Sequence, residues 1–180
     1  MKSIQFKFTD RTTFEKDLAE IKATNGNIPQ SAMLFYLSWT VNARTVVADA
    51  IAVIGQMFPD AIYYGNDSSG NISNGRLSYG LTVTCSFFER PDSRTELVWV
   101  EKGTATGSMD ELWDYCRDLD GLKAIELIPT LPSLEELSID RNVPGLDSGI
   151  AIFGGSCINS DNPIDEAFIV AKGHEISSSG

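Results

Sequence analysis

The chain has 180 residues, of which 42% are apolar and 22% are charged, as expected for a globular protein with a real core. Its net charge of −11 repels phosphate backbones and anionic lipid surfaces, which argues against nucleic-acid and membrane-surface partners. The sequence lacks both a run of about 18 apolar residues and an apolar leader, so we expect a cytoplasmic protein with no membrane span.

The first third of the chain alternates strand and helix patterns. Residues 4–8 alternate between apolar and polar and predict a short strand. Thr12 and Glu15 form a capping box that predicts the start of a helix, and residues 25–27, Asn-Gly-Asn, end it. The nearly apolar run Ser31–Trp39 then predicts a strand covered on both faces.

A second helix and two strands follow. Asn42 can cap the helix, whose wide apolar surface continues until Pro59 closes it. Ala61–Tyr64 is the next predicted strand, and Leu77–Phe88 is a long strand with one apolar face. Cys85 lies on that apolar face and is expected in the core.

The middle of the chain predicts one more strand and one more helix. The strand is Glu96–Val100, and the helix begins at a capping box of Ser108 and Glu111 and ends at Gly121. Cys116 lies on the apolar stripe of this helix. The three cysteines of the chain are far apart in sequence, which fits a reducing compartment and argues against a disulfide framework.

The last third repeats the early pattern. Lys123–Ile128 predicts a strand, Ser133 begins a capped helix, and Ile150–Phe153 and Glu166–Ala171 predict two further strands. The alternation of strands and helices predicts an α/β fold with a mixed β-sheet and flanking helices.

The recurring order of elements suggests an internal duplication of a strand–helix–strand–strand unit. Residues 32–88 would be the first copy and residues 123–171 the second. We expect the unbroken apolar strands Ser31–Trp39, Ala61–Tyr64 and Ile150–Phe153 to be central and buried in the sheet.

Two of these strands end abruptly in glycine and small polar residues. The residues at the two ends are Gly65, Asn66, Asp67, Ser68, Ser69 and Gly70, and Gly154, Gly155, Ser156 and Cys157. Such residues are also ordinary turn residues. Because ligands collect at the carboxyl ends of strands, we expect both loops to face one small-molecule pocket. A zwitterion such as an amino acid would be held by backbone N–H groups and by Asp67 at its ammonium group.

Residues Gly65–Ile72 resemble the signature of the N-terminal FIST sensory domain, which places glycines and small hydroxyl residues after an apolar strand. The segments Ser31–Phe58 and Ile152–Ser156 are also similar to that family, so the resemblance covers most of the chain. Two positions depart from the signature, because Asp67 replaces a hydroxyl residue and Asn71 replaces a glutamate.

The FIST resemblance implies a role in bacterial signal transduction. Residues 1–173 would form one sensory domain, and residues 174–180 a polar tail or cut linker. Such a domain would bind a small ligand, for example an amino acid, and control an output domain such as a diguanylate cyclase or a histidine kinase. The output domain would lie in the same chain or in a partner, and a homodimer stays open.

Two other function classes compete with this interpretation. Cys157 could be the nucleophile of a small enzyme, because backbone N–H groups at a strand end favour the thiolate, although no base is near it in sequence. The single histidine, His174, is expected at the surface, and neither a metal site nor a cofactor is predicted. The third class is an interaction module whose apolar helix faces pair with another subunit.

Overall fold

The computed structural model describes residues 1–40, 44–73, 75–100, 109–128, 145–147, 149–155 and 168–177. The helices in these ranges are α1 (Arg11–Asn25), α2 (Arg44–Met57) and α3 (Met109–Asp118), with a 3₁₀ turn at Gln30–Ala32. The first strands are β1 (Lys2–Lys7), β2 (Met33–Trp39), β3 (Ile62–Asp67), β4 (Asn71–Ser73), β5 (Arg76–Ser78) and β6 (Thr82–Phe87). The later strands are β7 (Ala124–Leu127), β8 (Ala151–Gly154), β9 (Ile169–Ala171) and β10 (His174–Ser177).

The largest sheet among the described residues is mixed and has six strands in the order β1-β6-β2-β3-β9-β10. Strands β2 and β3 run parallel, and their neighbours β6 and β9 pair with them antiparallel. Strands β4 and β5 form a separate hairpin, and β7 and β8 form a two-stranded parallel pair. The predicted α/β fold with a mixed sheet and flanking helices is therefore confirmed.

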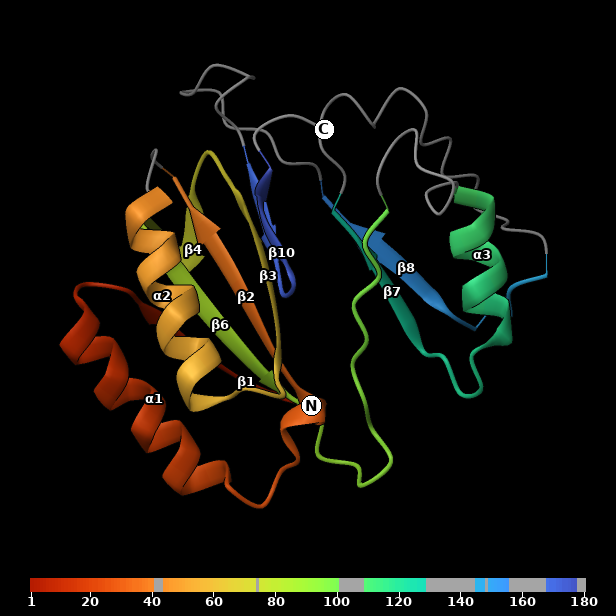
Figure 1. The fold of residues 1–180 in the computed structure, drawn as a ribbon, viewed down its shortest axis with the longest axis horizontal. Coiled ribbons are helices and arrows are strands. Elements are labelled where there is room, and N and C mark those ends of the chain that lie inside the picture. The colour runs from red at the N-terminus through yellow and green to blue at the C-terminus, as the bar shows by residue number, and fades with distance from the viewer. Residues whose placement is uncertain are drawn as a thin grey trace.

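The elements are arranged in layers, which Figure 1 shows from left to right. Helices α1 and α2 cover one face of the six-stranded sheet, and the β7–β8 pair lies on the other side, with α3 beyond it. Strand β2 alternates accordingly. Phe35, Leu37 and Trp39 are fully buried, and Phe35 packs on Phe58 after α2 with ring centroids 5.2 Å apart.

Two hydrophobic cores lie in these layers. The large core joins the six-stranded sheet to α1 and α2, and its largest side chains are Trp39, Phe14, Phe35, Phe58, Phe87 and Phe168. The small core lies between α3 and the β7–β8 pair, and its buried members are Leu112, Cys116 and Ile125. Both predicted core cysteines, Cys85 and Cys116, are buried.

Two of the three strands predicted to be central are central. Strand β2 lies between β6 and β3, and β3 lies between β2 and β9. The prediction for Ile150–Phe153 was wrong, because β8 belongs to a two-stranded sheet and Phe153 is 53% exposed. Its short apolar run is equally compatible with an edge strand that has only one partner.

The prediction of an internal duplication was wrong, because the strand orders of the two proposed units differ. The parallel pair β7–β8 matches the pair β2–β3, but β9 joins β3 in the large sheet instead of closing a second unit. The apolar residues around β9 explain this. Phe168 stacks on Trp39 at 4.6 Å between ring centroids, and Val170 is buried in the same core.

The cap of α1 was also predicted two residues too late. Asp10, not Thr12, caps the helix, since its carboxylate accepts from the Thr13 N–H at 2.9 Å and from the Thr13 hydroxyl at 2.7 Å. These bonds lower the pKa of Asp10. Glu15 instead pairs with Arg11 one turn before it. A carboxylate at this position accepts hydrogen bonds from otherwise unpaired N–H groups and interacts favourably with the positive end of the helix dipole.

Two predicted strands differ in the structure. Leu77–Phe88 is interrupted at Gly80, whose φ of +95° separates β5 from β6. Residues 96–100 form no strand. The segment before them is held to the 3₁₀ turn before β2, where the N–H and the hydroxyl of Thr95 both donate to the Ser31 carbonyl.

The predicted polar tail begins with a strand. Residues His174–Ser177 form β10, which pairs with β9, and His174 stacks on Trp99 with ring centroids 4.6 Å apart. The predicted caps Asn42, Ser108 and Ser133 lie outside the described residues. Within the described ranges, no helix has the length and apolar character needed to cross a membrane.

Candidate ligand-binding site

The first wall of the candidate site is the face of the large sheet that points away from α1 and α2. Tyr36 on β2 and Tyr64 on β3 are register partners, and their rings lie 5.2 Å apart. Asn66, two residues further along β3, lies on the same face, because strand side chains alternate. The Tyr36 hydroxyl donates to Asn66 Oδ1 at 2.8 Å, which fixes the amide against the sheet.

The predicted first loop is largely a strand. Strand β3 continues to Asp67, because residues 65–67 pair in register with 37–39 of β2. Gly65 serves this pairing, since a Cβ at Gly65 would lie 2.3 Å from the Leu37 carbonyl oxygen. The predicted close approach therefore occurs between two strands and not between Gly65 and a ligand.

The turn itself begins at Ser68. Its N–H donates to the Trp39 carbonyl at 2.7 Å, and its hydroxyl donates to the Gly70 carbonyl at 2.9 Å. Ser69 is exposed. The hydroxyl of Ser68 thus stabilises a compact turn, and the Ser68 side chain lies at the end of the sheet.

Asp67 does not take the position predicted for it. Its side chain is only 1% exposed, and strand alternation places it on the opposite face from Asn66. It is therefore absent from the described pocket lining and cannot be the partner of a ligand ammonium group there.

Asn71 has a structural role at the start of the β4–β5 hairpin. Its Oδ1 accepts from the Ser38 hydroxyl at 2.5 Å, and its Nδ2 donates to the carbonyls of Ser38 and Gly80, each at 3.1 Å. These bonds tie the hairpin to the end of β2. Asn71 therefore serves the fold, and it does not belong to the described pocket lining.

The second wall is the β7–β8 pair, which repeats the local geometry of the first. Leu127 on β7 is the register partner of Gly154, as Leu37 is of Gly65. Gly154 has a φ of +147°, and a Cβ there would lie 1.9 Å from the Leu127 carbonyl oxygen, so only glycine fits. Gly155 differs, because a Cβ at that position would meet nothing within 4 Å.

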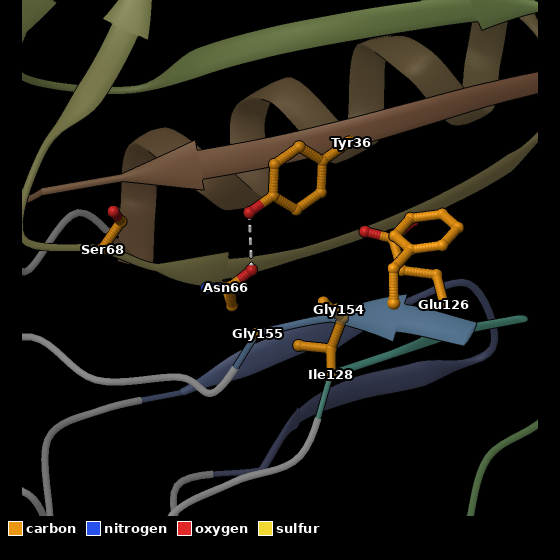
Figure 2. A pocket seen from close by; sticks show the side chains of 8 residues that line it. Tyr36, Asn66, Ser68, Glu126, Ile128, Gly154 and Gly155 are labelled. Atoms are coloured by element: carbon orange, nitrogen blue, oxygen red, sulfur yellow. Dashed lines mark hydrogen bonds between the residues drawn. The ribbon is translucent and has the colours of Figure 1, made fainter. Parts of the chain in front are cut away.

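One pocket of about 430 Å³ lies between the two walls. Figure 2 shows Tyr36, Asn66 and Ser68 on the side of the large sheet and Glu126, Gly154 and Gly155 on the side of the β7–β8 pair. The residues that line it are Tyr36, Asn66, Ser68, Glu126, Ile128, Phe153, Gly154 and Gly155. The structure thus brings part of each predicted loop to one pocket. Ser156 and Cys157 lie outside the described residues.

Sequence reasoning missed half of this lining, above all Tyr36 and Glu126. Both lie inside strands and not in the loops that follow. The available signal was a charged residue in the middle of the short strand Lys123–Ile128, where apolar residues are the rule. Glu126 accepts a short hydrogen bond from the Tyr64 hydroxyl. Burial and this hydrogen bond raise the pKa of Tyr64 far above its ordinary value.

The described lining combines one carboxylate with aromatic, amide and hydroxyl groups. Among the described lining residues, Glu126 is the one charged side chain, and Tyr36 and Phe153 contribute aromatic rings. The described residues contain no group of three or more His, Cys, Asp or Glu side chains that could hold a metal ion. Burial raises the pKa of the Cys85 thiol to about 12 and raises that of Cys116, so neither described thiol is an activated nucleophile.

Comparison of the chain with protein-family models, with curated proteins and with solved structures gives no match in any of the three.

Proposed function

We propose that this chain is a sensory domain that binds a small organic ligand in the pocket between the large sheet and the β7–β8 pair. The observation that carries this proposal is the convergence of two strand ends, with Asn66 and Ser68 on one side and Gly154 and Gly155 on the other, on one pocket of about 430 Å³. That volume is typical of small-molecule sites. The resemblance to FIST sensory domains supports the same function, with action in the cytoplasm.

The arrangement of the pocket suggests how binding could be communicated. The strands that form its two walls contribute to different hydrophobic cores, and a ligand that contacts both walls would favour conformations in which the walls are close. A signalling output domain, in the same chain or in a partner, would read that change. The pocket favours ligand binding over a pure interaction module, the class that the exposed apolar side chains of Ile72, Leu77 and Tyr79 at the β4–β5 hairpin would fit.

The proposal is tested by titration calorimetry of the wild-type chain against a panel of amino acids and simple amines. Gly155→Val is the decisive variant. Gly155 lines the pocket, and a Cβ there would meet no other atom within 4 Å, so the valine side chain would occupy space that the ligand needs. Ala151→Val is the matched control, since it adds a valine to an exposed position of β8 outside the pocket lining.

We expect at least one compound to bind, with an affinity that falls at least about tenfold in Gly155→Val, a loss of about 1.4 kcal/mol. Ala151→Val should bind as the wild type does. If every compound that binds does so equally well to Gly155→Val, or if none binds, the pocket is not the ligand site and the proposal fails.

A further inference from the structure

We propose that the pocket selects organic cations, placing an ammonium group between the Glu126 carboxylate and the aromatic rings of Tyr36 and Phe153. This inference rests on the proposed function, since it names the class of ligand that the same pocket takes. It also replaces the zwitterionic ligand expected from the sequence.

Charge is the first argument. Glu126 is the only charged side chain among the described lining residues, and they include no lysine, arginine or histidine. A ligand carboxylate would therefore meet a like charge and no side-chain cation. The whole chain carries a net charge of −11, which raises the local concentration of cations and lowers that of anions.

The position of the carboxylate is the second argument. The Tyr64 hydroxyl donates to Oε2 of Glu126, and Tyr64 itself is held by its ring contact with Tyr36. Because a carboxylate has about four lone-pair sites on two oxygens, this bond leaves acceptor capacity for a guest. Glu126 belongs to β7, but its carboxylate is oriented by Tyr64 of the large sheet. This hydrogen bond therefore connects the two walls of the pocket.

The aromatic residues are the third argument. Phe153 is the register partner of Glu126 across the β7–β8 pair, so the two side chains leave the same face of adjacent strands. Phe153 is 53% exposed and lines the pocket, so its ring is accessible to a guest. Tyr36 lies on the opposite wall (Figure 2). Aromatic rings around a carboxylate attract ammonium groups through the ring quadrupole.

The test uses three probes that share one ring and differ in charge: benzylammonium, benzyl alcohol and benzoate. Each is titrated calorimetrically into the wild-type chain, into Glu126→Gln and into Glu20→Gln. The Glu20→Gln control removes the same charge from an exposed position of α1, on the other side of the large sheet. It therefore separates the local carboxylate from the net charge.

We expect benzylammonium to bind the wild type at least about tenfold more tightly than benzyl alcohol, as a charge-assisted contact implies. Benzoate should bind most weakly. Glu126→Gln should reduce the preference for benzylammonium to about twofold or less, whereas Glu20→Gln should retain it. A preference that survives in Glu126→Gln, or benzoate binding as tightly as benzylammonium, overturns the inference.

A second variant guards against misfolding of Glu126→Gln. Phe153→Leu keeps an apolar residue at an exposed position, and it should lower the affinity for benzylammonium about threefold relative to benzyl alcohol, as loss of a cation–π contact implies. An unchanged ratio removes the aromatic part of the inference. If all three probes bind equally and Gly155→Val abolishes their binding, the proposed function stands and cation selection fails. If none binds, both fail.

Discussion

The β2–β3 pair and the β7–β8 pair are built in the same way locally and are completed differently. In each, two parallel strands place a leucine carbonyl against a glycine, at Leu37 and Gly65 and at Leu127 and Gly154. The β2–β3 pair has an antiparallel strand on each side and is covered by two helices. Among the described residues, the β7–β8 pair has no further strand on either side. The complete pair forms the stable core, and the incomplete pair leaves a face that lines a pocket.

The largest expected difference in stability between the two regions concerns one phenylalanine from each. Phe35 is fully buried in the large core, and Phe153 is 53% exposed on β8. Phe35→Ala should lower the free energy of unfolding by about 3 to 5 kcal/mol, because it leaves a cavity that cannot fully collapse. Phe153→Ala should cost about 1 kcal/mol or less. Urea titration of both variants measures the contrast, and equal losses would contradict it.

The glycines give the next contrast. Gly65→Ala places a Cβ 2.3 Å from the Leu37 carbonyl oxygen, so the strands must separate. We expect a loss of about 3 kcal/mol, the upper range for overpacking. Gly155→Ala meets nothing within 4 Å and should change stability by about 0.5 kcal/mol or less. Thermal unfolding of the two variants decides this, and a tolerated Gly65→Ala would show that the close strand contact is not required.

A smaller loss of stability, confined to one region, is expected for a truncation in the small core. Leu112→Ala truncates one of the three buried residues of this core in the described part of the chain, at a position 8% exposed, and should lower the free energy of unfolding by about 2 kcal/mol. Because this core is separate, native-state hydrogen exchange should show faster exchange in α3 and β7 with unchanged protection in β2. Equal acceleration in β2 would show that the two cores unfold as one unit.

The smallest expected effect on stability concerns the hydrogen bond from Tyr64 to Glu126, which joins the large sheet to the β7–β8 pair. Tyr64→Phe removes the donor to Glu126 and should cost about 1 kcal/mol at neutral pH. The raised pKa of Tyr64 means that the folded state keeps a proton that the unfolded state loses above about pH 10. Its contribution to stability is therefore complete below that pH and declines as the pH rises further. Urea titrations between neutral pH and pH 11 should show a steeper alkaline loss for the wild type than for Tyr64→Phe; parallel curves would contradict this.

The sequence predicted the parts of the fold that depend on local patterns. The apolar run Ser31–Trp39 and the strand that begins near Ala61 are central, and α1 ends at the predicted Asn-Gly-Asn stop. The prediction for Ile150–Phe153 was wrong, because an apolar run does not reveal whether a strand has one partner or two. That depends on β9, which joins the large sheet because Phe168, the residue before it, packs on Trp39 in the large core.

The site was predicted in part for a related reason. Glycine at two strand ends indicated where the pocket lies, but the extent of β3 decided which side chains face it. Once β3 extends to Asp67, alternation directs Asn66 to the pocket and Asp67 to the helix side. Glu126 and Tyr36 enter through tertiary packing between strands far apart in sequence, which no local pattern records.

The central claim is that one ligand contacts both walls of the pocket. Two-dimensional ¹H–¹⁵N spectra of the chain titrated with benzylammonium test it most directly. We predict that the amides of Asn66 and Ser68 on one wall and of Gly154 and Gly155 on the other shift together, with a single dissociation constant, while those of α1 do not move. Shifts confined to one wall, or different dissociation constants for the two walls, would contradict the shared site.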